Sequence, residues 1–476
     1  MLADCQPAYP MSCFFMLKLR GRFDVSVFTS ALQNALANHP LLTSIVIETK
    51  GKFYWQNTGT IPVITRLPLD EECRFPAAKG IDLFREPALN VTLCNNNTDP
   101  AAITLDGQTN IIFEVHHSAC DAAGIARFIE DIFCTYAQKT GFTDAQREAV
   151  HTDLLLHRGI FGQNSMRTLP KQLWGLTRAW MFLLNRVMPL ASTMETKPSA
   201  DYPAIIHRDL TPAKTQNVLQ TAKQFGITLN DLFLCSVFFA MKNWQEQQVP
   251  LLYPKWGQNR FFSFANFAFT LRPLWLKFYR KGRRESTEDA KEQFIFPCGY
   301  LRIAVPTNLR TSADILIPAA NIVSMVFLDR KPQNIRQTPS FYQGICREMQ
   351  HIKRYDLGWA FIHGLTLYRR IFGSFRKMVQ QNRCWTTATV SNLGRLFADI
   401  PLPKQEGRIQ IDKSLELIGI ETAPPIRAGT TLGISMLTYA DGMTVNLHYD
   451  SNVLTRSEAQ SILDDVVPTV FTESEA

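Results

Sequence analysis

Two adjacent histidines, His116 and His117, are followed by Asp121 four positions after the second histidine. An imidazole exchanges protons near neutral pH, so a histidine whose surroundings are fixed by an acidic neighbour predicts a general base. The same side chains could bind a metal ion, but His117 and Asp121 would need a third ligand, and no HExxH motif or His/Cys cluster offers one. Histidines that merely satisfy their hydrogen bonds are a third interpretation, and the pattern by itself leaves all three open.

The segments on either side of these histidines predict a junction between a strand and a helix. Residues 110–117, NIIFEVHH, are strongly β-prone, and residues 125–139, IARFIEDIFCTYAQK, have apolar side chains at helical spacing. Side chains at such a junction lie at the rim of a sheet, where ligands commonly bind. We therefore expect the histidines at a sheet edge rather than deep in the core.

The rest of the first half alternates predicted strands and helices. A strand is expected at Ser12–Arg20, followed by a helix that Asp24 caps and that His39 and Pro40 terminate. Further along the chain, two paired strands are expected around a Lys-Gly turn, LLTSIVIE and KFYWQ, and a later strand is expected in PALNVTLC.

The second half repeats this alternation loosely. A helix is expected at residues 212–225 and an apolar helix from about Asn230, while Asp441 and Gly442 indicate a hairpin turn. Strands are expected in IIHRDL, YLRIAVPTNLR, TTATVSNLG and the pair GISMLTYADGMTVNLHY. A change in composition places the domain joint between the halves. The expected division is an N-terminal lobe at 1–165, a linker with a basic amphipathic segment at 166–202, and a C-terminal lobe at 203–476.

Composition narrows the class of protein. The chain has 476 residues, 46% of them hydrophobic, which is enough for two or three domains with sizeable cores. Its 10 cysteines are scattered without a CxxC pair, which predicts reduced thiols in a cytosol. A net charge of +8 is diffuse over this length, and no nucleic-acid-binding module is present, so nucleic acid is not an expected partner. The start lacks a secretory signal, and no apolar run is long enough to span a membrane, so a cytoplasmic location is expected.

The segment EVHHSACDAAG resembles the HHxxxDG signature of the superfamily of condensation domains and alcohol acyltransferases. Four other segments resemble parts of that superfamily, in the expected order: FFMLKLRGRFDVSVFTSALQNALANHPLLTSIV, GIDLFREPALNVTL, RIAVPTNLR and TVSNLG. The resemblance implies an α/β (α+β) fold of two chloramphenicol-acetyltransferase-like lobes. Each lobe would be a mixed sheet with flanking helices, and the two would form a pseudo-dimer around a central tunnel.

The resemblance also implies roles for individual residues. His117, the second histidine of the motif, corresponds to the catalytic base, and His116 is its motif partner. Asp121 is implied to pair with a distant arginine, for which Arg310 is the candidate, because a bidentate arginine keeps a buried carboxylate ionised and fixes the loop. Asp121 would then be structural rather than part of a charge relay.

Other positions in the matching segments are less sharply assigned. Ser391 or Asn392 could donate a hydrogen bond to an oxyanion or line the tunnel, although a turn-forming role for Asn392 is an equal alternative. The motif glycine is replaced by Ala122, which could narrow the tunnel or indicate lost activity, and Gly124 could partly compensate. The DFGWG motif of plant relatives is absent.

The predicted function is transfer of an acyl group from an acyl-CoA thioester to an alcohol, forming an ester, with His117 as general base and no bound cofactor or metal. A first alternative is a free-standing condensation enzyme that takes its acyl group from the phosphopantetheine arm of an acyl carrier protein. A second is a non-catalytic binding protein of the same fold. Three segments that mix large apolar and basic residues, 169–190, 264–284 and 365–378, suggest peripheral membrane contact or ordinary core helices with extended basic side chains.

Overall fold

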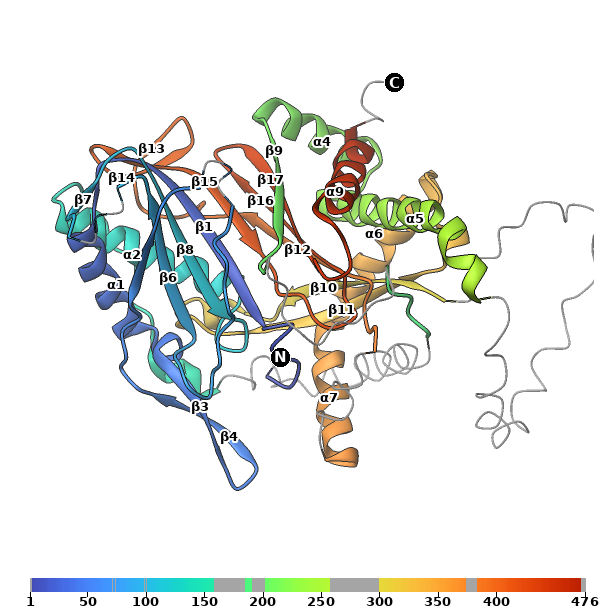
Figure 1. Cartoon of the computed structure of the whole chain (residues 1–476), viewed down its shortest axis with the longest axis horizontal. Coiled ribbons are helices and arrows are strands. Elements are labelled where there is room, and N and C mark those ends of the chain that lie inside the picture. The colour runs from blue at the N-terminus through green and yellow to red at the C-terminus, as the bar shows by residue number, and fades with distance from the viewer. Residues whose placement is uncertain are drawn as a thin grey trace, which may run out of the picture.

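A computed structural model describes residues 2–157, 185–190, 202–256, 299–373 and 383–471, apart from residues 71, 73, 98 and 100. Figure 1 shows two groups of strands, each with helices packed against it. The described chain contains one seven-stranded sheet, one six-stranded sheet and two short two-stranded sheets. The predicted fold class, two lobes that each combine a mixed sheet with helices, is confirmed.

The first lobe is built around the seven-stranded sheet, in the order β13-β14-β15-β1-β8-β6-β5. Helices α1 and α2 cover one of its faces (Figure 1), and they share an apolar core with the inward side chains of β1, β6 and β8. The bounds are β1 Ser12–Gly21, α1 Val25–Asn38, β5 Ile64–Leu67, β6 Leu89–Asn95, β8 Gln108–His116, α2 Ala122–Lys139, β13 Lys404–Gln405, β14 Arg408–Asp412 and β15 Leu415–Ala423.

Local sequence signals account for the start of this lobe. Asp24 caps α1, because its side chain accepts hydrogen bonds from the backbone N–H groups of Ser26 and Val27. The helix ends at Asn38, next to the His39 and Pro40 that were predicted to terminate it. The short strands of this part of the chain are β2 Phe23–Asp24, β3 Ser44–Thr49, β4 Lys52–Asn57 and β7 Thr104–Leu105. The predicted hairpin is confirmed, because β3 pairs with β4 in antiparallel register.

The second lobe is built around the six-stranded sheet, in the order β11-β10-β12-β16-β17-β9. Helices α4, α5, α6 and α9 contribute to one apolar core with this sheet, on the right of Figure 1. The bounds are β9 Ile205–Leu210, α4 Pro212–Gln224, α5 Leu229–Trp256, β10 Leu301–Asn308, β11 Val323–Arg330, α6 Pro339–Arg354, α7 Gly358–Phe372, β12 Ala388–Arg395, β16 Leu432–Tyr439, β17 Gly442–Tyr449 and α9 Arg456–Phe471.

The hairpin between β16 and β17 differs from the prediction by one position. Its turn residues are Ala440 and Asp441, which both have positive φ, and Gly442 pairs with Tyr439 as the first residue of β17. A two-residue turn with positive φ at both positions matches the twist of the flanking strands. The register of the hairpin is therefore set by the last residue pair of the β16–β17 ladder and not by the Asp-Gly pair alone.

Segments from late in the chain complete the first lobe. Strand β15 lies between β14 and β1, so the first sheet contains strands from both halves of the sequence. The residues after β12 also return to this lobe, where Phe397 packs against Phe133 of α2. The predicted linker, 166–202, lies outside the described residues except for 185–190 and 202. The proposed boundaries at 165 and 203 therefore remain a proposal.

The three basic apolar segments are only partly described. Residues 264–284 lie outside the described residues, as do 169–184 of the first segment, whereas Met188 and Leu190 at its end are buried in the core of the second lobe. The third segment is described as far as Gly373 and forms the end of α7. Within the described ranges, no single helix is long and apolar enough to cross a bilayer, although the bent pair of α4 and the first part of α5 together meet the criteria of length and composition.

Candidate active site

The two motif histidines lie where β8 ends and α2 is about to begin. His116 is the last residue of β8, and Asp121 caps α2 by accepting a hydrogen bond from the backbone N–H of Gly124 at 2.9 Å. The loop between them is held from outside, because the backbone N–H of His117 donates to the carbonyl of Met11 at 2.7 Å. We call residues 117–121 the histidine loop.

The side chain of His117 is held in one tautomer. Its Nδ1 lies 2.9 Å from the carbonyl oxygen of Cys120, and a carbonyl can only accept a hydrogen bond, so Nδ1 carries the proton. Nε2 is then left with a lone pair. Burial lowers the pKa of His117 below its usual value, opposed by the Cys120 hydrogen bond and by the charge of Asp121. His117 is therefore a neutral imidazole at pH 7 that can accept a proton at Nε2.

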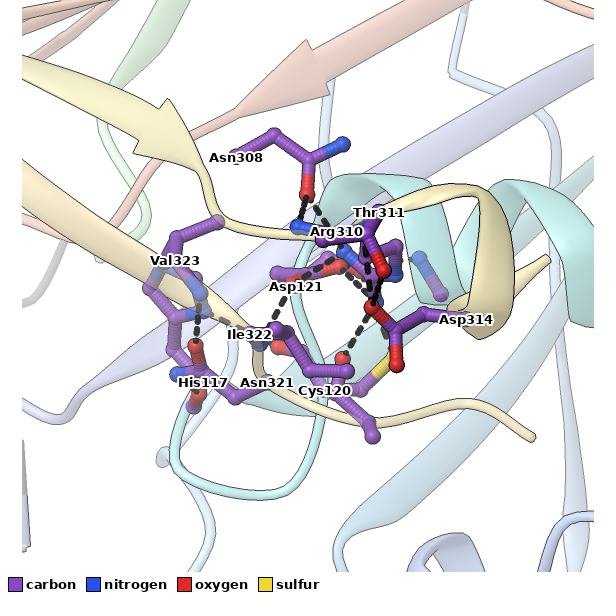
Figure 2. Close-up of polar contacts among 12 residues, drawn as sticks. His117, Cys120, Asp121, Asn308, Arg310, Thr311, Asp314, Asn321, Ile322 and Val323 are labelled. Atoms are coloured by element: carbon purple, nitrogen blue, oxygen red, sulfur yellow. Dashed lines mark hydrogen bonds and ion pairs between the residues drawn. The ribbon is translucent and has the colours of Figure 1, made fainter. Parts of the chain in front are cut away.

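Asp121 has both of its carboxylate oxygens occupied. Arg310 donates to both oxygens, at 2.8 and 2.9 Å, and the backbone N–H groups of Gly124 and Ile322 donate at 2.9 and 2.7 Å. The carboxylate is 1% exposed, and it is surrounded by the donors that a buried charge requires. Figure 2 shows Asp121 at the centre of these contacts. Its bonds run to Arg310 and to the backbone, so its geometry is that of an anchor for the loop and not of a relay partner for His117.

The segment between β10 and β11, residues 309–322, is bound to the first lobe at several points besides Arg310. The side-chain amide of Asn321 donates to the carbonyl of His117, and the backbone N–H of Ala319 donates to Nδ1 of His39 at 2.8 Å. Nε2 of His39 bonds Asp131 of α2 at 2.9 Å. We call this segment the crossover. Through it, the second lobe fixes the backbone of the histidine loop.

The surroundings of His116 indicate a structural role for its side chain. Its side chain is fully buried, and its Nδ1 accepts a hydrogen bond from the backbone N–H of Ser118 at 3.1 Å. Burial lowers the pKa of His116 to about 3, so the ring is neutral throughout the physiological range. A neutral, buried ring that is bonded to its own loop can hold the loop in shape beneath His117.

Position 124 requires a glycine, whereas position 122 does not. Ala122 is the first residue of α2, is partly exposed, and packs against the core of the first lobe. Gly124 is buried, and a Cβ there would lie 2.6 Å from the Cys120 sulfur and 2.9 Å from the Ala320 nitrogen. The close approach between α2 and the crossover therefore requires a glycine at position 124, whereas the backbone at Ala122 is ordinary helix.

Among the described residues, the side chains of Ser391 and Asn392 form no hydrogen bond with the histidine loop. Both residues lie on β12, where Ser391 is partly exposed and Asn392 is exposed. Asn392 accepts a hydrogen bond from the backbone N–H of Gly394 at 2.9 Å, which is the turn-forming alternative. Within the described chain, neither side chain bonds His117 or Asp121.

The sequence prediction missed three contributors to the site. Cys120 supplies the carbonyl that selects the His117 tautomer, Asn321 bonds the His117 carbonyl, and His39 anchors the crossover. His39 was predicted only as a helix terminator, and Asn321 was not singled out. Their contacts link positions 204 and 280 residues apart in the chain, so no local pattern marks them.

Among the described residues, no group of three or more His, Cys, Asp or Glu side chains is placed to hold a metal ion. The imidazole of His117 bonds the Cys120 carbonyl, whereas the Met11 carbonyl and the Asn321 amide bond the backbone of His117.

Comparison with solved structures identifies the fold. The chain is similar to the first condensation domain of the CDA synthetase (TM-score 0.63, 13% identity, covering 98% of this chain and 91% of that one). It is also similar to the starter condensation domain of rhizomide synthetase in complex with C8-CoA (TM-score 0.63, 13% identity, 100% and 92% covered). Trichothecene 15-O-acetyltransferase from Fusarium sporotrichioides matches as well (TM-score 0.60, 12% identity, 98% and 92% covered). No protein-family model and no curated protein matches the sequence.

These likenesses extend over nearly the whole chain, and they show that it shares the fold of these condensation domains and of this acetyltransferase. The resemblance stated from the HHxxxD segment is thus confirmed at the level of the fold.

Proposed function

We propose that the protein is an acyltransferase that moves an acyl group from a thioester to an alcohol, with His117 as the general base. The observation that carries the proposal is the hydrogen bond from His117 Nδ1 to the Cys120 carbonyl, which leaves the lone pair of a neutral imidazole on Nε2. Arg310, Asp121 and Asn321 support it, because they hold the histidine loop to the second lobe.

In the proposed reaction, Nε2 of His117 takes the proton of the acceptor hydroxyl as its oxygen attacks the thioester carbonyl. A C–O bond forms and the carbonyl becomes an oxyanion, for which Ser391 remains the proposed donor. When the oxyanion collapses, the C–S bond breaks, and the leaving thiolate takes the proton from the imidazolium. The products are an ester and a free thiol, and the imidazole returns to its neutral form.

Acyl-CoA is the proposed donor and an alcohol the proposed acceptor. Support comes from proteins of the same fold, since the rhizomide starter domain was solved with C8-CoA and the Fusarium protein is named as an O-acetyltransferase. With Ala122 in helical backbone, the motif glycine is not needed at that position for its conformation, which removes the main argument for a non-catalytic protein.

A second candidate is condensation with a carrier-bound thioester. The match to the CDA condensation domain over 98% of the chain favours it as strongly as the fold alone allows. The two candidates differ in the donor, so an acyl group on a phosphopantetheinylated carrier protein and the same acyl group on CoA should be compared at equal concentration.

The test is release of free thiol from a panel of acyl-CoAs with mixed alcohols and amines. Comparing wild type with His117→Ala should show a loss of about 100-fold or more in turnover, the usual contribution of a general base. His151→Ala is the matched control, because His151 is an exposed histidine outside the histidine loop. Turnover by His117→Ala at the wild-type rate would contradict the proposal.

A further inference from the structure

A cavity of about 190 Å³ lies beside the histidine loop. Its lining comes from the N-terminus, the β3–β4 hairpin and the histidine loop. The lining residues are Leu2, Val46, Phe53, Tyr54, Trp55 and Ser118. A cavity of roughly 150 Å³ holds a benzene molecule, so this one has room for an aromatic ring or an aliphatic group of similar size.

The hairpin presents aromatic side chains to solvent at this cavity. Phe53 is 54% exposed and Tyr54 is 49% exposed, and Phe53 contacts the ring of Phe84, which is 47% exposed. Single exposed apolar residues are common on protein surfaces, but aromatic residues gathered at one cavity indicate a binding site. Two other residues of the same hairpin, Val46 and Trp55, are held by packing, because they pair across the hairpin and contact an apolar cluster that includes Ile317 of the crossover.

Ser118 provides a buried polar group in the lining of the cavity. It follows His117 directly, and its backbone N–H bonds Nδ1 of His116. Its hydroxyl oxygen is shielded from solvent and has no hydrogen-bond partner. Buried polar atoms in proteins are almost always paired, so an unpaired hydroxyl in an apolar cavity is suited to a polar atom of a ligand.

The chemistry of the lining selects the ligand. None of the lining residues is charged, so the cavity offers no partner for the phosphates of CoA, which would require Lys or Arg. An uncharged molecule with one apolar group and one hydroxyl fits both the walls and Ser118.

Resting on the proposed function, we propose that this cavity binds the apolar group of the acyl acceptor, an uncharged alcohol with about one aromatic ring or an equivalent aliphatic group. The hydroxyl of the acceptor then lies at the Ser118 end, next to His117 in the chain. The cavity makes the enzyme selective for such alcohols over small ones such as ethanol.

The first arm of the test measures KM for 2-phenylethanol and for ethanol in the thiol-release assay. Phe53→Ala removes an exposed wall, and Val46→Phe fills the cavity from its buried side. Each should raise the KM for 2-phenylethanol about 10-fold or more, the usual effect of a changed apolar pocket, and should change the KM for ethanol much less. Ile103→Ala is the matched control, because Ile103 is 62% exposed and does not line the cavity. Equal effects on the two alcohols would overturn the proposal.

The second arm measures binding without turnover, by fluorine NMR of 4-fluorobenzyl alcohol with the full chain. Line broadening should persist with His117→Ala and vanish with Val46→Phe and with Phe53→Ala. If wild type binds this alcohol in a Phe53-dependent way but releases no thiol, the cavity is supported as an alcohol site and the acyltransferase proposal alone fails. If there is no binding, and flotation with anionic vesicles depends on Phe53, the cavity proposal is overturned in favour of membrane contact.

Discussion

Two bidentate arginine–aspartate pairs in the molecule have similar hydrogen-bond distances and different consequences. Arg302 donates to both carboxylate oxygens of Asp329, at 2.6 and 2.7 Å, and Arg310 does the same to Asp121, at 2.8 and 2.9 Å. Arg302 and Asp329 face each other across the β10–β11 ladder. Arg310 and Asp121 are 189 residues apart and connect the crossover to the histidine loop. The first pair stabilises one sheet, and the second positions a loop of the other lobe.

The comparison shows how the same kind of ion pair can serve stability or function, depending on the segments to which its two residues belong. Asp329 lies in a regular strand, whose ladder would position it without Arg302. Asp121 caps α2 and ends a short loop, and its contacts to Arg310 and Ile322 are among those that join that loop to the second lobe. Loss of the first pair should therefore affect folding most, and loss of the second should affect catalysis.

The largest loss of stability is expected for Arg302→Ala. Arg302 is 1% exposed and also donates to the carbonyl of Trp385, so the variant leaves a cavity in the sheet and leaves the Asp329 carboxylate, which is 18% exposed, with fewer donors. Breaking a buried pair typically costs about 3–5 kcal/mol. Urea unfolding measures this loss. If the variant folds, its kcat should remain close to that of wild type. A loss of kcat without a loss of stability would contradict the view that this pair serves stability and the Arg310 pair serves catalysis.

Arg310→Ala should be less destabilising and more damaging to activity. Asp121 keeps its two backbone donors, so we expect a loss of about 2–3 kcal/mol in the free energy of unfolding. A loop displaced by about 1 Å should lower kcat about 100-fold. The measurement is kcat for the thiol-release reaction, and Arg310→Lys should recover part of it. Unchanged kcat in Arg310→Ala would show that the pair does not position His117.

Gly124→Ala should separate the two segments that Arg310 joins. The added methyl group would lie 2.6 Å from the Cys120 sulfur and 3.0 Å from the Ala320 carbonyl oxygen, so α2 and the crossover must move apart. Overpacking of this kind costs about 1–3 kcal/mol. Ala122→Gly is the control, and its kcat should stay within about 2-fold of wild type because position 122 has ordinary helical backbone. A large gain of activity in Ala122→Gly would restore the view that the missing motif glycine impairs the site.

The smallest expected effect is a loss of folding stability in acid through the protonation of His116. Burial lowers the pKa of His116 to about 3, against about 6.5 in an unfolded chain, so the unfolded state binds more protons between these values. This stability is fully present above pH 6.5 and is lost as the pH falls toward the folded pKa. Lowering the pH from 6.5 to 5.5 should therefore cost about 1 kcal/mol from His116. Urea unfolding of wild type and of His116→Gln at both pH values measures this loss. The same change in the free energy of unfolding in the two proteins would refute the prediction.

Much of the fold follows from local sequence signals. Asp24 caps α1 as predicted, β9 spans Ile205–Leu210 as predicted, and β1 begins at Ser12 as predicted and ends one residue later, at Gly21. The long-range arrangement does not follow. Nothing local indicates that β15, which the sequence prediction missed, pairs with β1, because a strand pattern does not specify which strand will be its neighbour.

The candidate site shows the same division. The pairing of Asp121 with Arg310 was expected from the family resemblance, and the structure places the two side chains in contact. The pair formed by Arg302 was not predicted, because its partner depends on the register between β10 and β11. The tautomer of His117 depends on the path of the loop to the Cys120 carbonyl, which residue types alone do not determine.

The central claim is that His117 is held as a neutral base with its lone pair on Nε2. Nitrogen-15 NMR of the histidine-labelled full chain tests it directly, with the His117 signals identified by their absence from His117→Gln. At pH 7 the account predicts a protonated Nδ1, an unprotonated Nε2 and, because burial lowers the pKa of His117, titration below pH 6.5. A proton on Nε2, or an imidazolium at pH 7, would contradict it.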